Sequence, residues 1–261
     1  MARRKIYLKQ EWKTFAARPG IIFLGRRFAP QIEFMRARLA PGTYLGLHLT
    51  LGALILTGAA WLFGLIAEDV ATGDPVTLVD RNVSAWLHAR ATPQLTAAML
   101  VITYLHSLIG VSLIASFVAF YMWHRRRLFW LLALALAVPG GMLLNVLLKH
   151  AFHRVRPSFD NPILTLNTYS FPSGHTMAAT VLYGVLAAFA ASKLNSWRWR
   201  VMAILVAGLM ILLVGFSRIY LGAHYLSDVL GAMAEGLAWL ALCLTTVDTL
   251  RRHRAVNRVA P

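Results

Sequence analysis

Long apolar runs, separated by short polar or basic segments, fill most of the chain from residue 43 onward. A helix needs about 20 predominantly apolar residues to cross the hydrocarbon core of a bilayer. Runs of this kind predict an all-α, polytopic membrane bundle of about six transmembrane helices. We expect these helices at about Thr43–Ala67, Ile109–His124, Leu128–Leu148, Met177–Ser192, Val201–Phe216 and Tyr225–Thr249.

The second of these spans lies in an apolar run that is too long for one simple helix. The run extends from Leu95 to Trp123, and it indicates a surface helix, a break near His106 and Ser107, and then the span itself. An amphipathic surface helix is also expected around Leu78–His88, within an acidic outer loop.

The composition narrows the class of protein. Hydrophobic residues make up 58% of the chain and charged residues 14%, against about 25% charged residues in an ordinary soluble domain, which argues against a soluble globular or disordered protein. The 26 Lys and Arg residues exceed the 10 Asp and Glu residues, but they lie between apolar runs, so no nucleic-acid partner is expected. The single cysteine, Cys243, cannot form an intrachain disulfide.

The distribution of Lys and Arg predicts the orientation of the chain. In a six-span layout, 20 of the 26 basic residues fall in segments that share one side of the membrane. Short cytoplasmic segments carry the excess of Lys and Arg. Both termini are therefore expected in the cytoplasm, and the remaining six basic residues on the periplasmic or exterior side of the cell (inner) membrane.

The same pattern predicts three regions. Residues 1–42 form a basic amphipathic cytoplasmic segment, residues 43–249 the six-span membrane domain, and residues 250–261 a basic cytoplasmic tail. Two interpretations of the first region stay open: it lies on an anionic membrane surface, or it is a solvated basic anchor that sets the topology. A cleaved signal peptide is not expected, because the first long apolar run begins only after this basic lead.

The outer ends of the predicted helices carry the informative polar residues. The segments Lys149–Pro157, Phe171–His175 and Ser217–Asp228 belong to different loops, yet the topology brings them to one face of the membrane at one depth. A charge at membrane depth costs roughly 2.5–3.5 kcal/mol, so ionisable residues that gather at span ends suggest a functional site. We expect this site at the outer membrane–water interface.

The residue types in these segments suit a phosphate group. Lys149, Arg156 and Arg218 are three cations on one side of the membrane, and Arg can hold phosphate with two parallel hydrogen bonds. Ser173 and Gly174 open a predicted helix, where free backbone N–H groups and the helix dipole favour an anion.

Two histidines supply the complementary chemistry. His224 and Asp228 are four residues apart and share a helix face, so the carboxylate can fix one ring nitrogen and leave the other as a free lone pair, a nucleophile or a base. His175 follows the phosphate-binding turn and can protonate the departing oxygen. Together they allow displacement through a covalent phosphohistidine.

Other polar residues receive less specific interpretations. Glu235 is an acid in the middle of the last span, and its packing partner and role are not evident from the sequence. The other histidines match no paired pattern, and we assign them to interfaces or loops. They are His48, His88, His106, His124, His150, His153 and His253.

The three segments, with their order and spacing, resemble the signature of the type 2 phosphatidic acid phosphatase superfamily. The resemblance is tight from Lys149 to Asp228 and does not cover residues 1–42. It implies that His224 is the nucleophile, that Asp228 orients it and that His175 is the general acid. It further implies a metal-independent hydrolase without a cofactor. The phosphate oxygens would then be held by Lys149, Arg156, Ser173, Gly174 and Arg218.

The expected substrate is a lipid phosphate or diphosphate that reaches the site from the outer leaflet. Undecaprenyl diphosphate, phosphatidylglycerol phosphate and phosphatidic acid all fit this expectation. Two alternatives stay open: a phosphotransferase in which another lipid replaces water, and a transporter that binds an anionic lipid without chemistry. The transporter explains the cations but not the pairing of His224 with Asp228 beside His175.

Overall fold

A computed structural model describes residues 27–30, 33–34, 38, 46–73 and 76–257 of the chain. The chain divides into two compact units, residues 1–51 and residues 52–261. The expected N-terminal segment, residues 1–42, lies almost entirely outside the described residues, so its two interpretations remain predictions.

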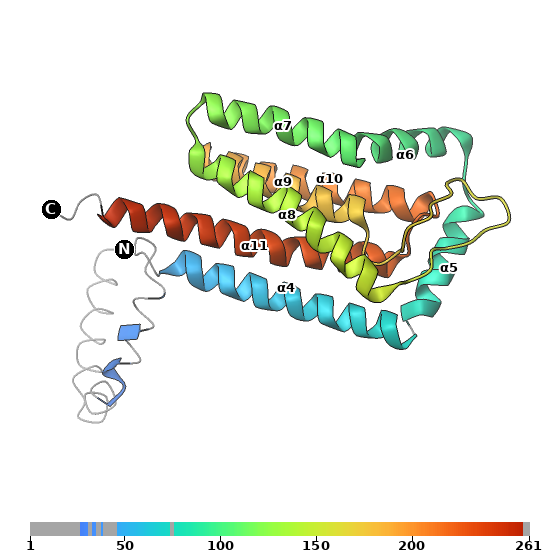
Figure 1. The fold of residues 1–261 in the computed structure, drawn as a ribbon, viewed down its shortest axis with the longest axis horizontal. Helices are drawn as coiled ribbons and strands as arrows, with labels where there is room; N and C mark the ends of the chain where they lie inside the picture. Colours follow the sequence, from blue (N-terminus) through green and yellow to red (C-terminus); the bar gives the residue numbers. More distant parts are fainter. Residues whose placement is uncertain (1–26, 31–32, 35–37, 39–45, 74–75, 258–261) are drawn as a thin grey trace, which may run out of the picture. The chain divides into compact units, whose positions relative to one another are not determined.

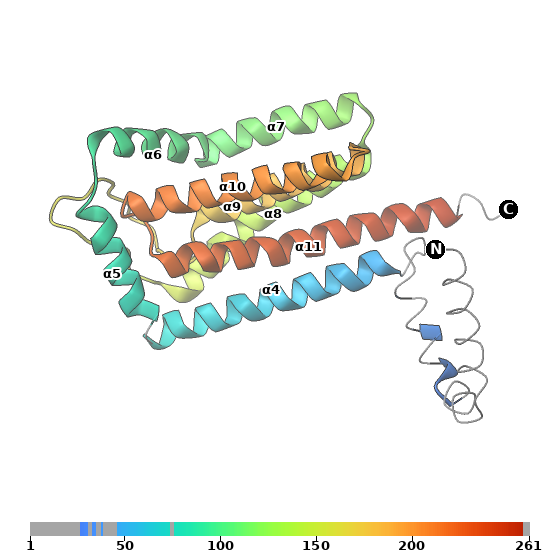
Figure 2. The same cartoon turned by 180° about the vertical axis from the view of Figure 1, so that it is seen from behind.

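The regular structure of the described residues is helical, as the apolar runs predicted. The helices are α4 (Leu47–Thr72), α5 (Val76–His88), α6 (Pro93–Leu105), α7 (Leu108–His124), α8 (Leu128–Phe152), α9 (Gly174–Lys193), α10 (Trp197–Tyr220) and α11 (Leu226–Asn257). Within the second unit, α6 to α11 run side by side, while α5 crosses one end of this bundle (Figures 1 and 2).

The number of membrane spans agrees with the sequence pattern. In the described part of the chain, five helices are long and apolar enough to cross a bilayer. The number is six if α6 and α7, which are bent by 53° at their break, are counted as one span. The break falls at His106 and Ser107, as predicted, and the Ser107 side chain caps α7 by accepting from Gly110 N. The helix before the break, α6, packs against α10 and so forms part of the bundle.

Several helices extend beyond the apolar runs that predicted them. Lys149 lies inside the last turn of α8, His175 inside the first turn of α9, and Arg218 inside the last turn of α10. Polar residues at a helix end retain the backbone hydrogen bonds of the helix. A hydropathy pattern leaves these residues out, so it makes the helix too short at its start or its end. The consequence is that rigid helices, rather than loops, carry these side chains.

Close packing of α8, α9 and α11 forms the centre of the bundle. Their buried residues include Leu134, Val181 and Ala232, and α7 adds Val111. Small residues allow the backbones to approach one another: a Cβ atom at Gly236 of α11 would lie 2.8 Å from Thr180 of α9. This rigid centre fixes the ends of the helices that carry the polar segments.

Candidate active site

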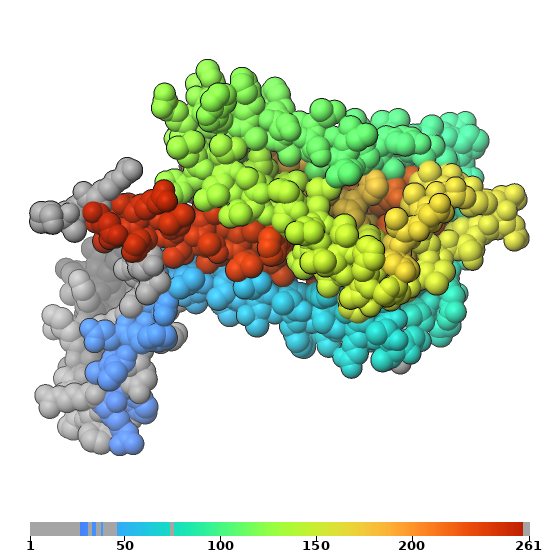
Figure 3. Space-filling view, viewed as in Figure 1, coloured from blue at the N-terminus to red at the C-terminus, as the bar shows by residue number. Residues whose placement is uncertain are grey.

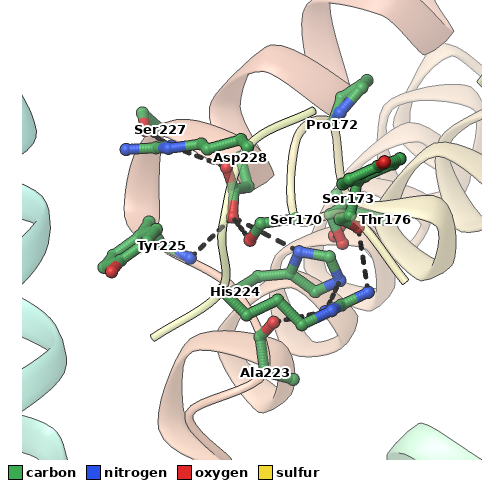
Figure 4. Close-up of polar contacts among 12 residues, drawn as sticks. Ser170, Pro172, Ser173, Thr176, Ala223, His224, Tyr225, Ser227 and Asp228 are labelled. Carbon is green, nitrogen blue, oxygen red and sulfur yellow. Dashed lines mark hydrogen bonds and ion pairs between the residues drawn. The ribbon is translucent and has the colours of Figure 1, made fainter. Parts of the chain in front are cut away.

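The pair predicted from the sequence, His224 and Asp228, lies buried at the end of the bundle that α5 crosses. His224 follows α10 and Asp228 lies in the first turn of α11, with His224 Nδ1 3.3 Å from Asp228 Oδ2. The carboxylate also accepts hydrogen bonds from Ser170 Oγ and, over 2.8 Å, from the backbone N–H of Tyr225 (Figure 4). Donors from two loops, the one before α9 and the one before α11, therefore hold Asp228 in one orientation.

The contacts of His224 define which ring nitrogen carries the proton. The Asp228 carboxylate only accepts hydrogen bonds, so Nδ1 is the donor. On the other side of the ring, Arg156 Nη1 lies 3.1 Å from Nε2, and a guanidinium only donates. Nε2 thus presents a lone pair. Burial holds the pKa of His224 well below its ordinary value although Asp228 opposes this shift, so the ring is neutral at pH 7.

Three predicted phosphate ligands lie within electrostatic range of His175, and none of them has a carboxylate partner among the described residues. Lys149 Nζ donates to the backbone oxygens of Tyr169 and Ser170 at 2.9 and 3.2 Å, and Arg156 is held by the backbone of the same loop. Within the described residues, neither they nor Arg218 forms an ion pair. Their positive charge is therefore available to an anion.

Arg218 is the most deeply buried of the three cations, with 2% of its surface exposed. Its Nη1 donates to Thr103 Oγ1 at 3.1 Å, while Nε has no hydrogen-bond partner among the described residues. A buried guanidinium N–H without a partner is costly in a folded protein, and a bound phosphate oxygen would satisfy it.

The start of α9 supplies the remaining predicted ligands. Ser173 is fully buried at the N-cap position, but its side chain does not cap the helix, so the N–H groups of the first turn stay open to a ligand. Gly174 allows the side chain of Asn145 to lie close to the helix start, because a Cβ atom at this position would be only 3.2 Å from Asn145 Oδ1. Anions bind readily at such a helix start.

The second histidine, His175, lies in the same first turn. It is within electrostatic range of Arg218, Arg156 and Lys149, and its ring makes no hydrogen bond to a described residue. It lines a cavity of about 600 Å³ together with Lys149 and Gly174. The ring is therefore free to meet a ligand.

The cavity opens on the flank of the bundle rather than at its tip. Figure 3 shows the hollow between α7, α8 and the loop that precedes α9. Its walls combine apolar side chains, among them Leu108, Met142 and Val146, with the polar residues Lys149 and His175. A mixed lining of this kind suits a molecule with a charged head and an apolar body.

Sequence reasoning missed two residues of this site. Arg154 donates to Asp228 Oδ1 at 2.6 Å and to Asp80 Oδ2 at 2.7 Å, and its guanidinium lies 4.5 Å from the centre of the Tyr225 ring. Burial acts to lower the pKa of Arg154, but Asp228 and Asp80 raise it above its ordinary value. Asp80 lies on α5, the helix expected around Leu78–His88, but its side chain is buried instead of facing the surface. The pairing links positions 74 residues apart, which no local pattern reveals.

His106 lies at an interface, as its sequence interpretation allowed, and it is also part of the cavity wall. It is buried at the α6–α7 break, lines the cavity, and its Nε2 lies 2.7 Å from the Tyr183 hydroxyl. Its other nitrogen lies 2.8 Å from the Ile102 carbonyl oxygen, so both nitrogens have protein partners.

In the described residues, no group of three or more His, Cys, Asp or Glu side chains is arranged to hold a metal ion.

Comparisons with known proteins show the family of this chain. Residues 128–252 match the model of the PAP2 superfamily. The chain is 32% identical over 195 residues to phosphatidylglycerophosphatase B of Bacillus subtilis, covering 74% of this chain and 96% of the relative. It is 31% identical over 116 residues to undecaprenyl-diphosphatase BcrC of the same organism, covering 43% of this chain and 55% of the relative.

A solved structure extends the likeness to the fold. The transmembrane PAP2 type phosphatidylglycerolphosphate phosphatase of Bacillus subtilis superposes with a TM-score of 0.65 at 31% identity, covering 72% of this chain and 93% of that one. Residues 128–252, which match the family model, include every predicted site residue.

Proposed function

The chain belongs to the PAP2 superfamily and is a membrane lipid phosphatase, and on this premise we propose that it removes a terminal phosphate from a glycerol-based lipid through a phosphohistidine. The observation that carries the proposal is the pair of contacts of His224: from them we infer a proton on Nδ1, facing Asp228, and a lone pair on Nε2, facing Arg156. An imidazole held in this way is a competent nucleophile.

In the first step, His224 Nε2 forms a bond to phosphorus while the bond from phosphorus to the lipid oxygen breaks. The electron pair of that bond passes to the lipid oxygen, which takes a proton from His175 and leaves as an alcohol. Arg156, Arg218 and Lys149 stabilise the charge on the three equatorial oxygens of the transition state. Asp228 stabilises the imidazolium that develops on His224.

In the second step, His175 acts in reverse. It takes a proton from water, the water oxygen bonds to phosphorus, and the bond from phosphorus to Nε2 breaks with its electron pair returning to His224. Inorganic phosphate then leaves. Replacement of water by a lipid alcohol would give the phosphotransferase alternative, while the transporter alternative offers no role for the His224–Asp228 pair.

The cavity supports a lipid as the substrate. Its apolar wall can accept the hydrocarbon part of a lipid whose phosphate reaches Lys149 and His175 from the flank of the bundle. Of the two relatives described above, the one named for phosphatidylglycerophosphate matches this chain over the larger share, which favours a glycerol-based phosphomonoester over a prenyl diphosphate.

Phosphate release from defined lipids tests this function. The purified protein should release phosphate from phosphatidylglycerol phosphate in detergent micelles faster than from phosphatidic acid or undecaprenyl diphosphate, and His224→Ala should be inactive on all three. Quenching the reaction in base, where phosphohistidine survives, should trap a labelled protein. Release of phosphate by His224→Ala at the wild-type rate would overturn the proposal.

A further inference from the structure

The buried acid Glu235 has a partner that the sequence did not reveal. Its Oε2 accepts a hydrogen bond from Asn145 Nδ2 of α8 at 2.9 Å, and its Oε1 has no partner among the described residues. Only 3% of Glu235 is exposed. A carboxyl group buried among apolar helices with one amide partner is costly to maintain, which points to a role beyond packing.

This hydrogen bond fixes the orientation of the Asn145 amide. Nδ2 faces both Glu235 Oε2 and, at 3.5 Å, the carbonyl oxygen of Pro172. A carbonyl oxygen only accepts, so the atom directed at it must be the amide nitrogen. The amide oxygen, Oδ1, is thereby turned away from α11, toward the start of α9.

Oδ1 of Asn145 then lies at the wall of the cavity. It lies beside Gly174, where a Cβ atom would be only 3.2 Å away, and Asn145 is part of the cavity lining. No described residue donates a hydrogen bond to this oxygen. The cavity wall thus presents a fixed, unused acceptor next to the phosphate ligands Gly174 and Lys149.

The cavity corresponds to the leaving-group side of the reaction. Its lining includes His175, the proposed acid, but not the nucleophile His224, which is buried behind the phosphate position. In-line displacement places the leaving oxygen opposite the nucleophile. The first carbon atoms of the departing alcohol would therefore lie beside Asn145.

From these contacts we infer that Asn145 accepts a hydrogen bond from a hydroxyl group next to the phosphate ester of the substrate, and that Glu235 is the positioning residue that holds its amide. This inference rests on the proposed function and names its substrate class: phosphomonoesters of a polyol headgroup. An acceptor oxygen repels a second phosphate, so diphosphate lipids gain nothing from this contact.

A pair of lipids that differ in one hydroxyl group tests the inference. One carries its terminal phosphate on a glycerol headgroup, and the other carries it on a 1,3-propanediol headgroup. The wild-type protein should show a kcat/KM about 10-fold higher for the glycerol lipid, the effect of one neutral hydrogen bond. Asn145→Leu should bring the ratio close to one by losing activity on the glycerol lipid alone.

Variants of Glu235 separate positioning from direct contact. Glu235→Leu should lower the ratio as Asn145→Leu does, because the amide loses the partner that orients it. Glu235→Gln keeps an oxygen that can accept from Asn145 Nδ2 and should retain the ratio. Thr180→Val removes a buried hydroxyl that does not line the cavity and serves as the control. The ratio of the two kcat/KM values is measured within one protein sample. It therefore does not depend on the fraction of that variant that is folded.

The outcomes are distinct. A wild-type ratio of one, or an equal loss on both lipids in Asn145→Leu, would overturn the inference and leave Asn145 as a structural neighbour of Lys149. A wild-type protein that releases phosphate from neither lipid would overturn the proposed function, and the inference with it.

Discussion

Arg154 forms an ion pair with Asp228 over 2.6 Å. The carboxylate that contacts the imidazole of His224 is therefore itself held by a cation from the loop between α8 and α9. The same guanidinium reaches Asp80 on α5, 2.7 Å away. The helix that crosses the end of the bundle, α5, is thereby connected through two ion pairs to the carboxylate that contacts His224. This connection gives α5 a direct part in the geometry of the site.

Loss of Arg154 should lower both the stability of the protein and its rate of phosphate release. Arg154→Ala leaves Asp228 and Asp80 buried without a counter-charge, which costs about 3–5 kcal/mol when a buried pair is broken. Asp80→Asn should cost less, because Arg154 keeps Asp228. Thermal unfolding in detergent, followed beside phosphate release, measures both effects. An Arg154→Ala protein as stable as the wild type would show that the network carries little energy.

The two histidines should respond differently to the leaving group. His224→Ala should be inactive on every substrate, because no phosphoryl acceptor remains. His175→Ala should lose about 10²–10⁴-fold on a lipid phosphate, the usual range for general acid catalysis, but much less on p-nitrophenyl phosphate, whose leaving oxygen is stable as an anion. Steady-state rates on both substrates measure this difference. Equal losses for His175→Ala would leave this residue as a phosphate ligand only.

The pH dependence of His224 follows from its burial. Since burial holds the pKa of His224 well below about 6.5, the nucleophilic neutral ring is fully present at and above that pH and is lost only as the pH falls through the lower value. NMR titration of histidine-labelled protein, with His224→Ala to assign the signal, measures this directly. A His224 signal that titrates above pH 6.5 would contradict the environment described for the ring.

The site should need no divalent ion and should bind vanadate. Orthovanadate can take a trigonal-bipyramidal form on His224 Nε2 that resembles the transition state of phosphoryl transfer, so it should inhibit. Activity measured after exhaustive treatment with a chelator should equal that of the untreated protein. Activity that disappears with the chelator and returns only with a divalent ion would reject the expectation.

Labelling of single cysteines in a Cys243→Ser background tests the orientation of the chain. Ser158 lies in the loop before α9, and Ser196 is the N-cap residue of α10. From the 20-to-6 split of basic residues, Ser158→Cys should react with an impermeant reagent in intact cells, and Ser196→Cys only after the membrane is broken. The reverse pattern would place the site in the cytoplasm.

The sequence predicted the parts of this protein that depend on local pattern. Apolar runs located the helices, and the His224–Asp228 spacing was readable because both residues lie within four positions. It could not predict pairs that only packing creates. Asn145 and Glu235 are 90 residues apart on different helices, and neither position carries a signal that names the other. Arg154 and Asp80 were missed for the same reason.

Because the cavity opens on the flank of the bundle, we expect the reaction rate to depend on the concentration of substrate within the membrane. A lipid that arrives between α7 and α8 reaches the site by diffusing within the leaflet, so encounters depend on its mole fraction among neighbouring lipids rather than on its amount per volume of water. Diluting the substrate with inert lipid at constant total substrate should slow turnover, whereas diluting the vesicles in buffer should leave the rate per protein unchanged. We therefore expect the saturation of the enzyme to depend on the fraction of substrate among the lipids of the surrounding membrane.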